Sequence, residues 1–206
     1  MGTRNITRVI LNGQMKVNQY CQWDGYPDGR GIDVLTFMRD ILICGRLRDF
    51  KYGIEHSNLV DLNDDDNTFY TGAPYYKHLF DLLDRKSEYE NFDDTVKRNL
   101  TDGKITEHEA NYLMVASRDV GNDVLPYMVK YSPSGMIFYT SDYLTHIGEE
   151  LDWQIEGMFV IDLDKSIVKI IYHNKSKEYN FEALEKMTND EIKTEMENLE
   201  KADEED

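Results

Sequence analysis

The sequence has few cysteines and no long apolar run. Its two cysteines, Cys21 and Cys44, fit a reducing compartment, and no CxxC or Cys/His cluster is present to hold zinc. No stretch approaches the roughly 20 apolar residues that a membrane helix needs, and the N-terminus lacks the apolar segment of a signal peptide. These absences predict a cytoplasmic protein with no metal site and no membrane partner.

Positive charge is also scarce. The chain has 23 Lys and Arg against 40 Asp and Glu, a formal net charge of -17, and residues 177–206 alone hold four lysines and twelve acidic residues. Direct binding to a nucleic-acid backbone needs clustered Lys and Arg, so we do not expect it. Solubility is the simplest reason for the acidic balance. An acidic surface that imitates nucleic acid before a basic partner protein is the alternative.

Length and composition are those of one folded domain. With 206 residues, of which 40% are hydrophobic, the chain can bury a substantial core. We expect a single domain over residues 1–187, followed by an acidic tail, helical or disordered, over residues 188–206.

Two hairpins at opposite ends of the chain dominate the predicted secondary structure. Residues 4–11 and 14–22 are predicted strands around Asn12-Gly13, a strong signal for a two-residue turn. Residues 153–163 and 167–173 form a second hairpin. Helices are expected over residues 32–44, 74–85, 107–118, 120–131 and from 181 on, with a short strand at 136–140 and an ambiguous segment at 47–62. The pattern predicts an α+β fold, a mainly antiparallel sheet built from both hairpins and covered by several helices.

The two-residue turn also predicts the register of the first hairpin. It places Arg8 opposite Val17 and Arg4 opposite Cys21. Arg4, Arg8 and Cys21 then share one face of the sheet, and the polar residues gather at the end nearest Trp23. Such a gradient is what a site at one end of a sheet would produce.

The most distinctive stretch runs from Gln19 to Gly31 and reads QYCQWDGYPDGRG. Gly25, Gly29 and Gly31 permit backbone angles that other residues avoid, so backbone N–H groups can turn toward one point. A helix beginning near Ile32 would direct its positive end to the same point. The stretch therefore suits an anion such as phosphate, although a tightly packed strand-to-helix turn explains it equally well.

Cationic and aromatic side chains near this loop are of the types that bind a nucleotide. The predicted phosphate ligands are Arg4, Arg8, Lys16 and Arg30, and the predicted stacking residues are Tyr20, Trp23 and Tyr26. The structural alternative is that Arg4 and Arg8 pair with Asp24, Asp28 or Glu156.

Asp24 is the best candidate for a general base, with Arg4 as the catalytic cation beside it. A phosphodiesterase or nucleotide hydrolase without metal or other cofactor could use Asp24 to assist attack by a ribose hydroxyl, with arginine on the phosphate. Sequestration without cleavage stays open, as does a purely structural role for Asp24 as a turn cap before Gly25. Cys21 would be a nucleophile only beside an imidazole, and a core position explains it more simply.

The segments Gly2-Thr3-Arg4-Asn5 and Trp23-Asp24-Gly25-Tyr26-Pro27, with Gly29 and Gly31, resemble the marks of an uncharacterised protein family common in bacteriophages and also seen in bacteria. Residues 153–162 are similar to a later strand of that family. The resemblance implies a phage accessory protein in the bacterial cytoplasm, where such proteins blunt host defences and several bind or destroy nucleotide signals.

We therefore expect an anti-defence protein that binds a small nucleotide or cyclic nucleotide, with cleavage as an open extension. An acidic inhibitor that binds a host protein is the alternative. The oligomeric state stays open, and a two-fold homodimer that completes one pocket is an arrangement that small binding proteins often use.

Overall fold

The structure is a computed structural model of the chain, and it describes residues 3–21, 23–55, 58–61, 92–104, 106, 121–130, 137–140 and 155–204. The helices predicted over residues 74–85 and 107–118 lie outside these ranges. Within the described ranges, no helix is both long enough and apolar enough to cross a membrane.

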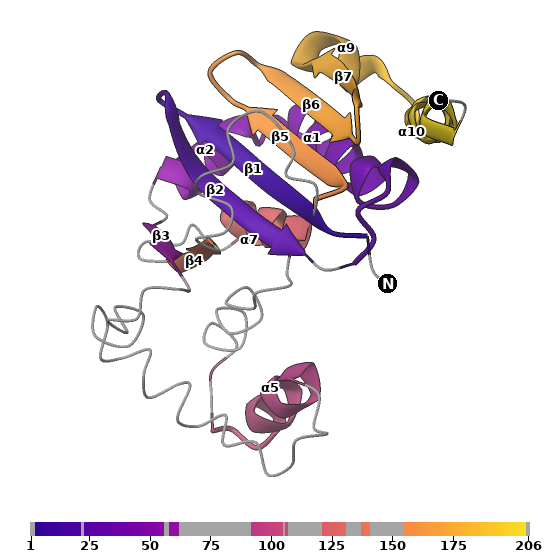
Figure 1. Cartoon of the computed structure of the whole chain (residues 1–206). Helices are drawn as coiled ribbons and strands as arrows, with labels where there is room; N and C mark the ends of the chain where they lie inside the picture. The colour runs from indigo at the N-terminus through magenta and orange to yellow at the C-terminus, as the bar shows by residue number, and fades with distance from the viewer. Residues whose placement is uncertain are drawn as a thin grey trace.

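Five strands form the main sheet in the order β2-β1-β5-β6-β7. Their bounds are β1 Asn5–Leu11, β2 Gln14–Cys21, β5 Gly157–Asp162, β6 Ile167–Tyr172 and β7 Lys175–Asn180. All neighbouring strands are antiparallel except β1 and β5, which run parallel at the centre of the sheet (Figure 1). The α+β fold and the sheet built from both ends of the chain are thereby confirmed.

Strand β7 is an addition to the predicted hairpin. Its sequence, KSKEYN, is mostly polar, and Tyr179 is the only residue in it that is buried. Edge strands often carry charged side chains, which discourage pairing with another chain. This is why the hydrophobic pattern did not reveal it.

Helices cover one face of the main sheet. They are α1 (Ile32–Ile43), α2 (Leu47–Glu55), α7 (Leu125–Lys130), α9 (Phe181–Lys186) and α10 (Asn189–Glu204). In α1, helical spacing places Val34, Leu35, Met38 and Ile41 on the buried side. They join Phe159 and other inward-facing strand residues in the main core.

The middle of the chain contributes shorter elements. A parallel pair, β3 (Asn58–Asp61) and β4 (Ile137–Thr140), forms a second small sheet. The helix α5 (Phe92–Thr101) was not predicted. The helix predicted over residues 120–131 is a 3-10 turn, η2 (Gly121–Val124), that leads into α7. Pro126 lies in the first turn of α7, where a missing N–H breaks no helical hydrogen bond.

The predicted register of the first hairpin is wrong beyond Met15. Lys16 is an extra residue on β2, because Ile10 pairs with Met15 while Val9 pairs with Val17. The resulting β-bulge shifts the rest of β2 by one residue, so Cys21 lies opposite Asn5 rather than Arg4. A shift of one residue moves every later side chain to the other face of the sheet.

The C-terminal segment forms a long helix on the core. Ile192, Met196 and Leu199 of α10 are buried in the main core, and Lys177 and Tyr179 of β7 contact the Glu195 carboxylate. Of the two forms expected for the acidic tail, the structure shows the helical one through Glu204.

Candidate functional site

Two glycines let the loop after β2 lie directly against β5. The Gly25 N–H donates to the Thr3 carbonyl oxygen at 3.0 Å. A β-carbon at Gly25 would lie 2.9 Å from that oxygen, and a β-carbon at Gly157 would overlap the carbonyl oxygen of Gly25. Close backbone packing therefore explains both glycines. It also fixes residues 23–31, which form the corner between β2 and α1.

The backbone N–H groups of the glycine-rich loop are hydrogen-bonded within the protein. Gly29 and Gly31 donate to the Tyr26 carbonyl oxygen at 3.2 and 3.4 Å, and Arg30 donates to the Asp24 carbonyl oxygen at 3.3 Å. The residues from Pro27 to Gly31 form a short π-helical turn, η1 (Pro27–Gly31), that leads into α1. These amides do not converge on an external anion, so the geometry favours a packed turn over a backbone phosphate cradle.

Two aromatic side chains of the corner reach solvent. Trp23 is 57% exposed and Tyr26 is 42% exposed. The backbone beside them is held firmly, since the Trp23 carbonyl oxygen accepts hydrogen bonds from Asn5 Nδ2 at 2.8 Å and from the Cys21 thiol at 3.4 Å. Between the two aromatics, Asp24 adopts a left-handed φ of 58° and is exposed.

Arg30 lies behind the corner, next to Cys21. Its Nη1 is 2.8 Å from Asp123 Oδ1, and its Nη2 lies 3.9 Å from Cys21 Sγ. Burial by itself would lower the pKa of the guanidinium, but the hydrogen bond and charge of Asp123, with smaller effects of Cys21 and Asp33, raise the pKa above its ordinary value. The guanidinium therefore stays charged in a largely buried position.

Polar side chains line the buried side of this corner. Asn5, Thr7, Cys21 and Asn122 are all buried where η2 packs on β1 and β2. Within the part of the chain that the structure describes, Asn5 Oδ1, Thr7 Oγ1 and Asn122 Oδ1 have no hydrogen-bond partner. In proteins, buried polar atoms of this kind are usually hydrogen-bonded to ordered water or to a ligand. The polar cluster thus adds hydrogen-bonding capacity behind the aromatic pair.

Sequence reasoning did not find Asn5, Asn122 or Asp123. The predicted register placed Asn5 on the face away from Cys21, and only the bulge at Lys16 brings the two together. Residues of η2 are about one hundred positions away from the loop in sequence. No local spacing could signal their arrival beside Arg30.

The structure brings together only part of the predicted site. Trp23, Asp24, Tyr26 and Arg30 share the corner, whereas Arg8 lies on the other face of the sheet from Cys21. There Arg8 Nε donates to Asn18 Oδ1 at 2.9 Å, and burial lowers the pKa of the Arg8 guanidinium.

Of the remaining predicted residues, Arg4 has its backbone against Gly25, whereas Lys16 lies away from the corner. Lys16 forms the bulge nearer the opposite end of β2, and the side chain of Tyr20 lies outside the described residues. The Arg4 backbone N–H donates to a Glu156 carboxylate oxygen at 2.6 Å. Among the residues that the structure describes, no ion pair joins Arg4 to Asp24.

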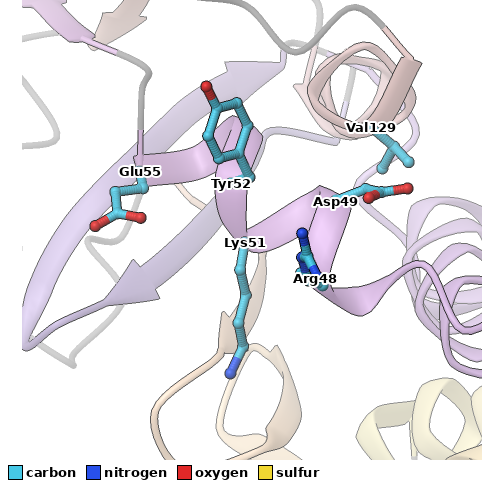
Figure 2. A pocket seen from close by; sticks show the side chains of 6 residues that line it. All are labelled: Arg48, Asp49, Lys51, Tyr52, Glu55 and Val129. Atoms are coloured by element: carbon cyan, nitrogen blue, oxygen red, sulfur yellow. The ribbon is translucent and has the colours of Figure 1, made fainter.

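Surface concavities lie away from the glycine-rich loop or beside α1. One, of about 290 Å³, is on the open face of the main sheet and includes Arg8. Another, of about 400 Å³, lies between α1 and α10. A further one, of about 340 Å³, lies between α2 and α7. Figure 2 shows its Arg48, Lys51 and Tyr52 side chains leaving α2 in different directions, together with the carboxylates of Asp49 and Glu55. Its mixed charges indicate no particular ligand.

Comparison of the chain with protein-family models, with curated proteins and with solved structures finds no match. The resemblance to a phage protein family therefore stays a prediction. The described part of the chain also holds no group of three or more His, Cys, Asp or Glu residues placed to bind a metal ion. The geometry of the corner is therefore the basis for inferring a function.

Proposed function

We propose that the protein binds a small nucleotide at the corner between β2 and α1, as a phage accessory protein that intercepts a nucleotide signal would. The observation that carries the proposal is the exposure of Trp23 and Tyr26 in the same loop as the charged, largely buried Arg30. An exposed aromatic ring offers a face for a nucleobase, and such stacking contributes about 1–3 kcal/mol per base. A guanidinium matches the oxygens of a phosphate group in pairs.

The phosphate would be recognised by a side chain, because the amides of Gly25, Gly29, Arg30 and Gly31 already have backbone acceptors. Arg30 is the predicted phosphate ligand whose guanidinium lies behind the corner, next to Asp123 and Cys21. The polar cluster behind it supplies amide and hydroxyl groups of the kind that read a base or a sugar.

Binding has more support than cleavage. The Asp24 carboxylate is exposed, and within the described residues no cation lies at ion-pair distance from it. A general base must be held within hydrogen-bond reach of the proton that it removes. Hydrolysis by Asp24 and Arg4 therefore remains a prediction, and the experiment below separates it from sequestration.

The test is a thermal-shift screen of the purified full chain with nucleoside phosphates, cyclic mononucleotides and cyclic dinucleotides. A ligand that raises the melting temperature is then recovered from the denatured protein and analysed by chromatography. We expect at least one nucleotide to stabilise the protein and to be recovered intact. Altered products would show hydrolysis, and a screen without any shift would contradict the proposed function.

Trp23→Ala should then weaken binding by roughly 5- to 150-fold, the equivalent of one lost stacking contact. The melting temperature of the ligand-free protein should hardly change, because the side chain is exposed. Tyr52→Ala is the matched control, since Tyr52 is an aromatic residue of α2 with 47% exposure and lies outside the corner. Equal effects of both substitutions would show that the ligand does not stack on Trp23.

A further inference from the structure

The Asp123 carboxylate occupies the position beside the Arg30 guanidinium that an external anion such as phosphate could take. We propose that Asp123 competes with the phosphate of the ligand for Arg30, and that phosphate binds by displacing the Asp123 side chain. This inference rests on the proposed function, because it assigns the phosphate to Arg30.

The hydrogen-bonding capacity of Arg30 is only partly used. A guanidinium carries five N–H donors in a planar fork. Nη1 contacts Asp123 Oδ1 at 2.8 Å, Nη2 is 3.9 Å from the weak acceptor Cys21 Sγ, and Nε is buried with no acceptor. A phosphate group with several oxygens can meet more of these donors than the single carboxylate oxygen does.

Asp123 is placed so that its side chain can leave while its backbone stays fixed. The Asp123 side chain is 60% exposed, whereas that of Arg30 is only 14% exposed. The preceding residues anchor η2, since Asn122 is buried and the backbone of Gly121 lies against Cys21. An exposed carboxylate is already largely hydrated, so its rotation away from Arg30 into water costs little.

The exchange predicts an unusual effect of removing a carboxylate. Asp123→Asn leaves a side chain of the same size but removes the competing charge from Arg30, so an incoming phosphate should bind more tightly. The control is Asp33→Asn, because Asp33 is exposed in the first turn of α1 and acts on Arg30 through charge alone. Both substitutions change the net charge equally.

The experiment is isothermal titration calorimetry of the full chain with inorganic pyrophosphate at fixed ionic strength. We expect Asp123→Asn to bind at least fivefold more tightly than wild type, Asp33→Asn to stay within twofold of wild type, and Arg30→Lys in the Asp123→Asn background to lose the gain. Equal affinity of Asp123→Asn and wild type, an equal gain in Asp33→Asn, or no binding by either Asp123→Asn or wild type would overturn the exchange.

The nucleotide screen separates this inference from the proposed function. If nucleotides stabilise the wild type but Asp123→Asn binds pyrophosphate no more tightly, only the exchange is overturned. If Asp123→Asn gains affinity for pyrophosphate while no nucleotide stabilises the wild type, the anion site stands and the nucleotide function is overturned.

Discussion

At the scale of single residues, the corner depends on three glycines, which have no side chain and so allow backbone segments to pack closely. Gly25 and Gly157 place the loop after β2 in backbone contact with β5. Gly121 adopts a left-handed φ of 54°, and a β-carbon there would lie 2.8 Å from Cys21 Cβ. Each of these glycines brings a segment close to the end of the sheet at which the corner lies.

Gly157→Ala should therefore reduce the free energy of unfolding by more than about 2 kcal/mol, since the added methyl group would overlap backbone atoms that cannot rotate away. Urea unfolding of the variant measures the loss. Gly45→Ala is the control, because Gly45 has a φ of 65° but no heavy atom within 4 Å of the place that a β-carbon would take. Its cost should be backbone strain alone, about 1 kcal/mol. Equal losses in the two variants would contradict the role of close packing.

Asp164 connects the two hairpin turns. Its carboxylate oxygens accept hydrogen bonds from the Asn12 and Gly13 N–H groups at 2.9 and 2.7 Å. These bonds, with that from Gly13 the stronger, lower the pKa of Asp164 below its ordinary value of 3.8. The carboxylate thus favours the folded state at pH values above 3.8, and this contribution disappears as the pH falls through the lower folded-state pKa.

Asp164→Asn should consequently destabilise the protein at neutral pH, and the difference from wild type should shrink as the pH falls below about 4. Urea unfolding of both proteins at pH 7 and at pH 3 provides the measurement. A difference that stays constant between the two pH values would show that the ionised carboxylate does not stabilise the turns.

At the scale of elements, the bulge in β2 decides which side chains reach the helices. With Lys16 outside the pairing, Val17 and Cys21 lie on the helix-covered face together with Val9 and Asn5. If Lys16 paired with Val9 and formed no bulge, Val17 and Cys21 would point to the opposite face. The bulge is therefore what places the Cys21 thiol beside Arg30.

Deleting Lys16 should change the free energy of unfolding by no more than about 1 kcal/mol, because the regular strand that results still pairs Val17 with Val9 and keeps the buried side chains of β2 in the core. Lys16→Ala keeps the bulge and serves as the control, with an expected change within about 1 kcal/mol. Circular dichroism during urea unfolding measures both. A deletion variant far less stable than Lys16→Ala would mean that the bulge itself, and not only the register that it sets, stabilises the fold.

At the scale of the whole molecule, the acidic C-terminal segment belongs to the core. Figure 1 shows α10 at the β7 end of the sheet, and Ile192 and Met196 are fully buried there. On its outer side Glu197 pairs with Lys193 and Lys201. Truncation would remove core packing, so the alternative function as an acidic inhibitor of a host protein has to be tested by charge substitution on the exposed side of α10.

Ile192→Ala should cost about 2–5 kcal/mol of stability, the range typical of a large apolar side chain removed from a packed core. Thr194→Ala, an exposed position in the same helix, should change stability by no more than about 0.5 kcal/mol. Thermal unfolding of the two variants compares them directly. Similar melting temperatures would contradict the packing of α10 on the sheet.

The sequence by itself determined the features that depend on neighbouring residues. The Asn12-Gly13 turn, the helix over residues 32–43 and the strands of both hairpins follow from turn chemistry and from apolar periodicity, which act over a few positions. The same local reasoning identified Trp23, Tyr26 and Arg30 as neighbours of one loop.

Only the tertiary structure decided how distant segments meet. The parallel pairing of β1 with β5, the bulge at Lys16 and the contact of Arg30 with Asp123 each depend on how the sheet and helices pack together. Segments far apart in the chain come together only where the complete core holds them, and no short-range pattern records that packing. Arg8 and Arg30 were both predicted from the sequence to bind phosphate. In the fold they lie apart, and of these two only Arg30 lies at the corner.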